Sequence, residues 1–310
     1  MDSLTVVIPT YNRAEVLKKA LNGYKSQSAV EAITELIVVD DGSTDHTKAV
    51  VEETSKDCTF PVRYLWQPNK GPAAARNVGI AEARSGLILF SDSDIVPERD
   101  LISQHLKSHR ENPENATAIL GYVTWPPEPK PTPFMKWYGE AGPLFAFRRF
   151  TASGPLSFDY FYTCNVSMKL DFLRINGQFD EEFKIAAYED IELGYRLIKA
   201  GMVLLYNPNA VAYHHQYFHF EDACRKAQAN RTAIEIFFKK EAGRHILVQQ
   251  KKRQSRIAYR MARSLALVVG AIFSPTKRLM DSYVRLPPFI YHLIYWYHAN
   301  CSIDSYSNEP

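Results

Sequence analysis

Short β-branched runs alternate with helix-like segments through the first 90 residues, and this alternation constrains the fold more than any other feature. Residues 5–8, 36–39 and 87–90 form short apolar runs followed by polar residues, which is typical of a fully buried strand. The segments between them place apolar residues at helical spacing. We expect strands at residues 5–8, 36–39, 62–65 and 87–90, and helices near residues 16–24, 45–56 and 73–84. The pattern predicts an α/β fold with a mostly parallel, Rossmann-like sheet and helices on both faces.

Polar side chains follow three of these predicted strands. In such sheets, ligands bind beyond the carboxyl ends of the strands. The sequence therefore predicts a binding site formed by Thr10 and Tyr11 after the first strand, Asp40 and Asp41 after the second, and Asp92, Ser93 and Asp94 after the fourth.

Asp92 and Asp94 are two residues apart on a segment that we expect to be extended, so both carboxylates can face one ligand. Hard oxygen ligands suit Mg²⁺ or Mn²⁺, which can hold a substrate diphosphate. The alternative is a solvated turn before Pro97.

Asp41 can accept a hydrogen bond from a nucleobase or a ribose. Alternatively, the acidic residues there lie exposed at the start of a helix that Ser43 caps.

Five segments, in order and in spacing, resemble the family 2 inverting glycosyltransferases with the GT-A fold. They are VVIPTYNR, VVDDGSTD, GPAAARNVGI, LILFSDSDIVP and AAYEDIELGYRL. The resemblance covers roughly residues 3–215 and implies a nucleotide-sugar-binding and catalytic domain over residues 1–215. It also implies inverting transfer of a hexose from a nucleoside diphosphate, with UDP as the expected nucleotide, to a glycan or lipid-linked acceptor in polysaccharide or glycolipid assembly.

The resemblance also implies roles for individual residues. Asp94 would be the main ligand of Mn²⁺ or Mg²⁺, Asp92 would face the metal and the ribose, and His214 would be a third ligand, although a histidine that merely ends a strand is commoner. The residues expected around the nucleotide sugar are Pro9, Thr10, Tyr11, Asp40, Asp41, Lys70, Arg76, Asp92 and Ser93.

Asp190 is the residue that the resemblance implies as the catalytic base. Inverting transfer needs one carboxylate to take the proton of the acceptor hydroxyl. Acidic residues also favour the first turn of a helix, and the helix macrodipole there would lower the pKa of Asp190. Glu189 and Asn165 are expected on the acceptor side, where Asn165 can alternatively be part of a turn.

Residues 126–162 are predicted to form a lid over the acceptor side. Five prolines fall within residues 125–133, and the aromatic residues that follow show no clear period. A long irregular stretch inside a compact domain is usually a lid or a binding loop.

Charge separates residues 216–310 from the rest of the chain. The net charge is +3, yet residues 221–285 hold 15 Lys and Arg against 5 Asp and Glu. Together with Trp and Tyr, these residues predict a helical region that either binds an anionic membrane surface or packs as a solvated subdomain. No nucleic-acid recognition motif accompanies the charge.

Cysteine spacing and hydropathy bear on localisation. The four cysteines lie far apart, which favours a reducing compartment, and no apolar run approaches the roughly 20 residues of a spanning helix. We expect a cytoplasmic protein, at most peripheral to the membrane. A catalytically silent nucleotide-sugar-binding module and a nucleotidyltransferase are the alternative functions.

Overall fold

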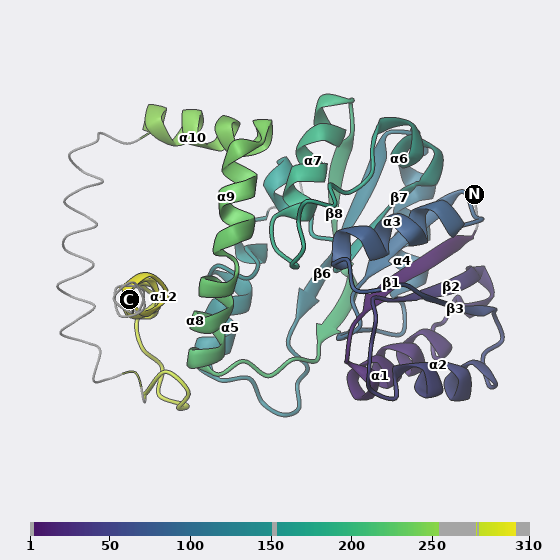
Figure 1. The fold of residues 1–310 in the computed structure, drawn as a ribbon, viewed down its shortest axis with the longest axis horizontal. Coiled ribbons are helices and arrows are strands. Elements are labelled where there is room, and N and C mark those ends of the chain that lie inside the picture. The colour runs from purple at the N-terminus through teal and green to yellow at the C-terminus, as the bar shows by residue number, and fades with distance from the viewer. Residues whose placement is uncertain (1–2, 151–153, 254–276, 278, 302–310) are drawn as a thin grey trace. The chain divides into compact units, whose positions relative to one another are not determined.

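The computed structural model describes residues 3–150, 154–253, 277 and 279–301. The chain divides into two compact units. The first joins residues 1–124 with residues 150–215, and the second joins residues 125–149 with residues 216–310. Figure 1 labels the elements of both units along the chain.

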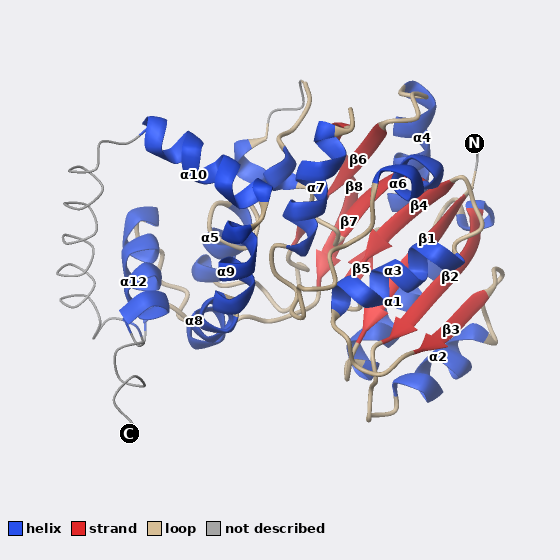
Figure 2. Ribbon diagram, turned by 45° about the horizontal axis from the view of Figure 1, so that its top comes forward, coloured by secondary structure: helices blue, strands red, loops and turns tan. Residues whose placement is uncertain are grey.

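An eight-stranded sheet lies at the centre of the described part of the first unit, in the order β3-β2-β1-β4-β7-β6-β8-β5 (Figure 2). The strands are β1 (Leu4–Thr10), β2 (Ile33–Asp40), β3 (Val62–Trp66), β4 (Leu87–Ser91), β5 (Ile95–Pro97), β6 (Thr117–Thr124), β7 (Asn165–Lys169) and β8 (Val203–His214).

Strands β3, β2, β1 and β4 form a parallel half-sheet. Every residue of β1 is buried, because neighbouring strands and helices cover it on all sides. Helix α3 (Pro72–Glu82) packs on β1 and β2, and α2 (Thr47–Ser55) packs on β2, β3 and α1 (Ala14–Lys25). The approach of α3 depends on Gly79, since a Cβ there would lie 2.3 Å from Cγ1 of Val7. The predicted α/β fold with helices on both faces is confirmed (Figure 2).

The other half of the sheet is mixed. β7 runs antiparallel to β4 and β6, whereas β8 runs parallel to β6 and antiparallel to β5. Strand β8 pairs with β6 through a shift of register between Gly121 and Tyr122. The helices of this half are α4 (Leu101–Glu111), α6 (Leu170–Asn176) and α7 (Glu189–Lys199).

The described part of the second unit is helical. Its helices are α5 (Pro133–Glu140), α8 (Phe220–Ala229), α9 (Arg231–Lys239), α10 (Glu241–Arg253) and α12 (Pro288–Cys301). Aromatic side chains form much of its core: the ring of Phe134 lies 5.4 Å from Phe220, and that of Trp137 lies 5.8 Å from Tyr291. Within the described residues, no helix combines the length and apolarity that crossing a bilayer requires.

Helix α5 corrects one expectation from the sequence. The segment after the proline run is not irregular throughout, because Pro133 occupies the first turn and the hydroxyl of Thr132 accepts a hydrogen bond from the amide of Met135. Phe134, Trp137 and Tyr138 then share one buried helical face. The proposed closure of residues 126–162 over the acceptor side stays a prediction.

Candidate active site

The loops after β1 and β2 are bound to each other at the carboxyl edge of the sheet. Asn12 adopts a left-handed conformation with φ of 50°, which asparagine tolerates better than most residues. Its side-chain oxygen accepts a hydrogen bond from the amide of Thr44, and its own amide donates to the hydroxyl of Ser43, both at 2.8 Å. This arrangement leaves the side chain of Tyr11 48% exposed at the end of β1.

Asp40 and Asp41 lie at the predicted edge, but both carboxylates accept hydrogen bonds from the protein itself. Asp40 accepts from the Tyr64 hydroxyl at 2.6 Å and from the Ser43 amide at 2.8 Å. Asp41 accepts from the amides of Lys70 and Gly71, both at 2.8 Å. Asp41 therefore fixes the loop before α3, and the Lys70 side chain on that loop is exposed.

Arg76 connects the two acidic motifs. This α3 residue is only 2% exposed, and its guanidinium donates to Asp92 and to Glu189, each at 2.8 Å. Burial alone would lower the pKa of Arg76, but the charges of Asp92 and Glu189 raise it above its ordinary value. Glu189 is therefore buried in an ion pair with Arg76, and its place on the acceptor side stays a prediction.

Asp94 and His214 approach each other because β5 and β8 pair directly after the acidic motif. Ile95 is the register partner of His214, and the amide of His215 donates to the carbonyl of Asp94. This pairing places Nε2 of His214 3.4 Å from Oδ2 of Asp94. Arg13 also forms an ion pair with Asp94.

A carboxylate and an imidazole are ligands that Mn²⁺ accepts, so these side chains fit a divalent cation. Pro9 and Thr10, at the end of β1, and Ser93, directly before Asp94, are also buried. Within the described residues, however, His, Cys, Asp and Glu side chains do not form a group of three that could hold a metal ion.

Asp190 lies in the first turn of α7, as predicted, but its electrostatic environment differs from the expectation. Burial, and then the neighbouring charge of Glu189, raise the pKa of Asp190 to about 7. The macrodipole was expected to lower this pKa, and burial outweighs it. Tyr188 precedes the helix in a left-handed conformation with φ of 70°. The Asp190 carboxylate accepts a hydrogen bond from the amide of the next residue, Ile191.

Asn165, which is predicted on the acceptor side, lies in β7, and its role toward an acceptor stays a prediction. It is buried in β7, where its side-chain oxygen accepts a hydrogen bond at 2.8 Å from Nε2 of His105. Its amide donates to the carbonyl of Ala210 at 2.9 Å. Nδ1 of His105 bonds to Ser167 at 2.8 Å. Asn165 thus stabilises the interior of the sheet. Its neighbours in the sequence are also compatible with a turn, so they did not indicate this position.

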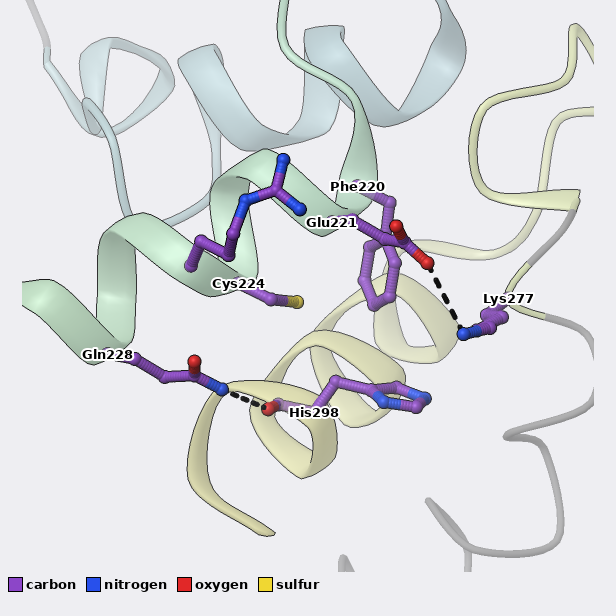
Figure 3. A pocket seen from close by; sticks show the side chains of 7 residues that line it. Phe220, Glu221, Cys224, Gln228, Lys277 and His298 are labelled. Atoms are coloured by element: carbon purple, nitrogen blue, oxygen red, sulfur yellow. Dashed lines mark hydrogen bonds and ion pairs between the residues drawn. The ribbon is translucent and has the colours of Figure 1, made fainter. Parts of the chain in front are cut away.

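The second unit contains a separate cavity of about 200 Å³, lined mainly by side chains of α8 (Figure 3). Its cations already have carboxylate partners: Nζ of Lys277 lies 3.3 Å from Glu221, and Arg225 pairs with Asp222. A diphosphate would have to compete with both acids. The first unit therefore holds the candidate active site.

The sequence model of Glycosyl transferase family 2 matches residues 5–168, more than half of the chain. The chain belongs to glycosyl transferase family 2. Its matched region contains the β1, β2 and β4 edges at which the polar residues gather, and it ends within β7. The expectation of a family 2 glycosyltransferase is thus confirmed.

Among family 2 relatives, validoxylamine A glucosyltransferase from Streptomyces hygroscopicus subsp. jinggangensis is 34% identical over 224 residues, covering 64% of this chain and 52% of that protein. The chain spans about half the length of this relative and of a second validoxylamine A glucosyltransferase, from Streptomyces hygroscopicus subsp. limoneus.

Two solved structures share the fold. The mannosyltransferase from Pyrobaculum calidifontis, solved with GDP-Man and Mn²⁺, has a TM-score of 0.60 at 15% identity and covers 99% of this chain and 88% of that one. TarS from S. aureus, solved with UDP-GlcNAc, has a TM-score of 0.53 at 20% identity, covering 76% and 66%. At such identities the likeness concerns the fold, which is GT-A.

Two residues of the candidate active site were not predicted from the sequence. Arg13 pairs with Asp94, and its position directly after the polar end of β1 was a usable signal. Cys164 is buried before β7, where burial and then the charges of Asp92 and Asp190 raise its thiol pKa well above the ordinary value. Its sequence surroundings held no signal for this position.

Proposed function

We propose that the protein is a metal-dependent inverting glycosyltransferase that moves a hexose from a nucleoside diphosphate, UDP in the first instance, to an acceptor hydroxyl. The observation that carries the proposal is the Arg76 bridge. It joins Asp92, in the acidic motif after β4, to Glu189, the neighbour of Asp190 on α7. One buried cation therefore connects Asp92 with the residue that precedes the proposed base in the chain, which supports a single site.

The donor would lie along the carboxyl edge of β1, β2 and β4. Tyr11 offers an exposed ring for stacking on the base, and the exposed Lys70 can reach a phosphate. Asp41 orders the loop that carries Lys70. The nucleotide sugars in the two solved relatives support a nucleotide-sugar donor here.

Asp94 and His214 would hold Mn²⁺ or Mg²⁺, together with Asp92, which precedes Asp94 by two residues and pairs with Arg76 in this structure. The Mn²⁺ in the mannosyltransferase structure supports this. When bound, such a cation would neutralise charge on the donor diphosphate as it leaves. Arg13, whose side chain is 41% exposed, pairs with Asp94 and can move aside toward solvent.

Asp190 would act as the general base. A carboxylate whose pKa is about 7 is partly ionised at neutral pH and binds a proton more strongly than an ordinary aspartate. It would take the proton of the acceptor hydroxyl while that oxygen attacks the anomeric carbon opposite the leaving diphosphate, which inverts the configuration. Glu189 positions Arg76, and Arg76 remains charged because two carboxylates hold it.

The acceptor, the membrane surface and the cytoplasmic location stay proposals. Arg256, Arg260 and Arg263, which contribute to the positive charge of residues 221–285, lie outside the described residues. We propose a glycan or lipid-linked acceptor and reversible attachment to an anionic surface, supported by the charge of residues 221–285.

The test combines binding with stereochemistry. Thermal shifts with UDP-, GDP- and dTDP-sugars, each with and without Mn²⁺, should identify a donor that stabilises the protein only with metal. NMR of the product formed from that donor should then show an anomeric configuration opposite to the donor's. Retention of configuration, or donor binding that does not respond to metal, would contradict the proposal.

A further inference from the structure

Four partly exposed aromatic side chains form a continuous set in the first unit. The ring centroid of Phe150 lies 4.6 Å from that of Tyr160 and 5.1 Å from that of Tyr206. Tyr160 lies 6.3 Å from Tyr162 in turn. All three contacts are edge to face, and all four residues keep part of their surface exposed. We call Phe150, Tyr160, Tyr162 and Tyr206 the aromatic platform.

One side of the platform is fixed to α7 by a close backbone approach. A Cβ on Gly194 would lie 2.6 Å from Cβ of Phe161 and 2.9 Å from the carbonyl oxygen of Phe158. Only glycine therefore lets the segment that carries Tyr160 and Tyr162 lie on this helix. The ring of Phe158 also packs 5.1 Å from Tyr195 of α7.

This contact places the platform beside the proposed base. Helix α7 begins with Glu189 and Asp190. Gly194, which contacts Phe161, lies four residues after Asp190, about one helical turn, and Tyr162 follows Phe161 in the chain. Burial, and then the charge of Asp190, raise the pKa of Tyr162 above its ordinary value. The set runs from Tyr162, near Asp190, through Tyr160 and Phe150 to Tyr206.

The other side of the platform is fixed to the sheet. Tyr206 belongs to β8, and the amide of Leu156 donates to the carbonyl of Leu204 on the same strand at 2.7 Å. Because a strand and a helix hold its two sides, the platform can present a surface of defined shape.

We infer that the aromatic platform is the acceptor subsite and that it accepts a pyranose ring of a glycan. The inference rests on the proposed function, because it takes Asp190 as the base that the acceptor must reach. A pyranose has an apolar C–H face and a polar rim. Aromatic rings offer electron-rich faces to the C–H groups, and the hydroxyl of Tyr160 offers a hydrogen bond to the rim. A polyprenyl chain would match aliphatic side chains better, and a polyol phosphate would match cations.

The test measures acceptor KM, using the donor that gives the largest Mn²⁺-dependent thermal shift. The probes are cellobiose, maltose, lactose and diacetylchitobiose, alongside a polyprenyl phosphate and poly(glycerol phosphate). Tyr160→Leu and Phe150→Leu should raise the KM of the accepted saccharide about tenfold, with the donor-induced thermal shift unchanged. Tyr160→Phe, which keeps the ring, should stay within about threefold of the parent. Tyr283→Leu, which removes an exposed tyrosine from the second unit, is the control and should match the parent.

The outcomes separate this inference from the function on which it rests. Transfer to the phosphate acceptors alone, or a saccharide KM that neither leucine variant changes, would overturn the platform while leaving the transferase intact. A parent protein that neither binds nor consumes any nucleotide sugar would overturn the proposed function, and the platform with it.

Discussion

At the residue scale, Asp190 shows how tertiary burial changes what a helix position alone predicts. The first turn of a helix favours ionised carboxylates. Burial and the adjacent Glu189 act in the opposite direction and raise the pKa of Asp190 to about 7. The result suits a general base at neutral pH.

This pKa predicts the pH profile of the reaction. The base must be ionised to accept a proton, so kcat/KM should increase tenfold per pH unit below about 7 and level off above it. A profile of initial rates at subsaturating acceptor, at constant ionic strength, measures this. An acid limb near pH 4 would mean that Asp190 titrates as an ordinary aspartate.

The same shift predicts an effect on stability. A carboxyl group whose pKa is higher in the folded state than its unfolded value of 3.8 binds more protons when folded. Its contribution to stability is therefore lost as pH rises from about 4 to about 7. Asp190→Asn should melt a few degrees above the parent at pH 8, with the gain shrinking at pH 5.5. A variant that melts lower at both values would indicate that the charged carboxylate stabilises α7.

Asp94 and His214 give a third residue-scale prediction. Asp94→Ala should abolish the Mn²⁺-dependent thermal shift with donor. His214→Gln should weaken Mn²⁺ affinity by roughly 10-fold to 100-fold, since the glutamine amide is a poorer ligand than the imidazole. Titration of Mn²⁺ at fixed donor distinguishes the two effects. Lys130→Ala, on an exposed residue of the second unit, is the control. If Asp94→Ala responds to Mn²⁺ and donor as the parent does, the metal assignment is wrong.

At the element scale, most of the parallel half of the sheet was predictable because β1, β2 and β4 each contain a short apolar run. The mixed half was not. β7 carries Asn165, Ser167 and Lys169, polar residues that are buried through contacts with distant parts of the chain. The bridge from Arg76 to Glu189 spans 113 positions, so periodicity could not reveal it. The order of the motifs predicted that Arg76 and Glu189 belong to the site, but their contact became visible only in the folded structure.

The contact between α3 and β1 gives an element-scale prediction. Alanine favours helix over glycine by about 1 kcal/mol, yet a Cβ at position 79 would lie 2.3 Å from Val7. Overpacking of this kind costs about 1–3 kcal/mol, so Gly79→Ala should lower the free energy of unfolding. Adding Val7→Ala should relieve part of the loss, which a double-mutant cycle in urea would measure. Strict additivity of the two losses would contradict the contact.

At the scale of the whole molecule, the two compact units interleave along the sequence. Residues 125–149 leave the first unit and pack with residues 216–310, and the chain then returns to the first unit. Only one boundary, at residue 215, was predicted from the sequence. The aromatic face of α5 packs against α8 and α12, and the proline run before α5 did not indicate this contact.

A chain that ends at residue 215 should therefore expose Phe134, Trp137 and Tyr138, which are buried in the full chain. Such an apolar surface promotes association. We expect increased fluorescence of the dye ANS and a concentration-dependent size in light scattering. Phe134→Ser in the shortened chain should reduce both signals. If the shortened chain is monomeric and gives the same ANS fluorescence as the full chain, α5 does not need α8 and α12 to bury its aromatic face.

The central claim is that Asp190 performs chemistry at a donor site formed by other residues. The most direct measurement compares donor affinity and turnover in Asp190→Asn with those of the parent, by calorimetry with Mn²⁺ and by release of the nucleoside diphosphate. We predict unchanged donor affinity with turnover reduced about 10²–10⁴-fold. Turnover near that of the parent, or a parallel loss of donor affinity, would contradict the claim.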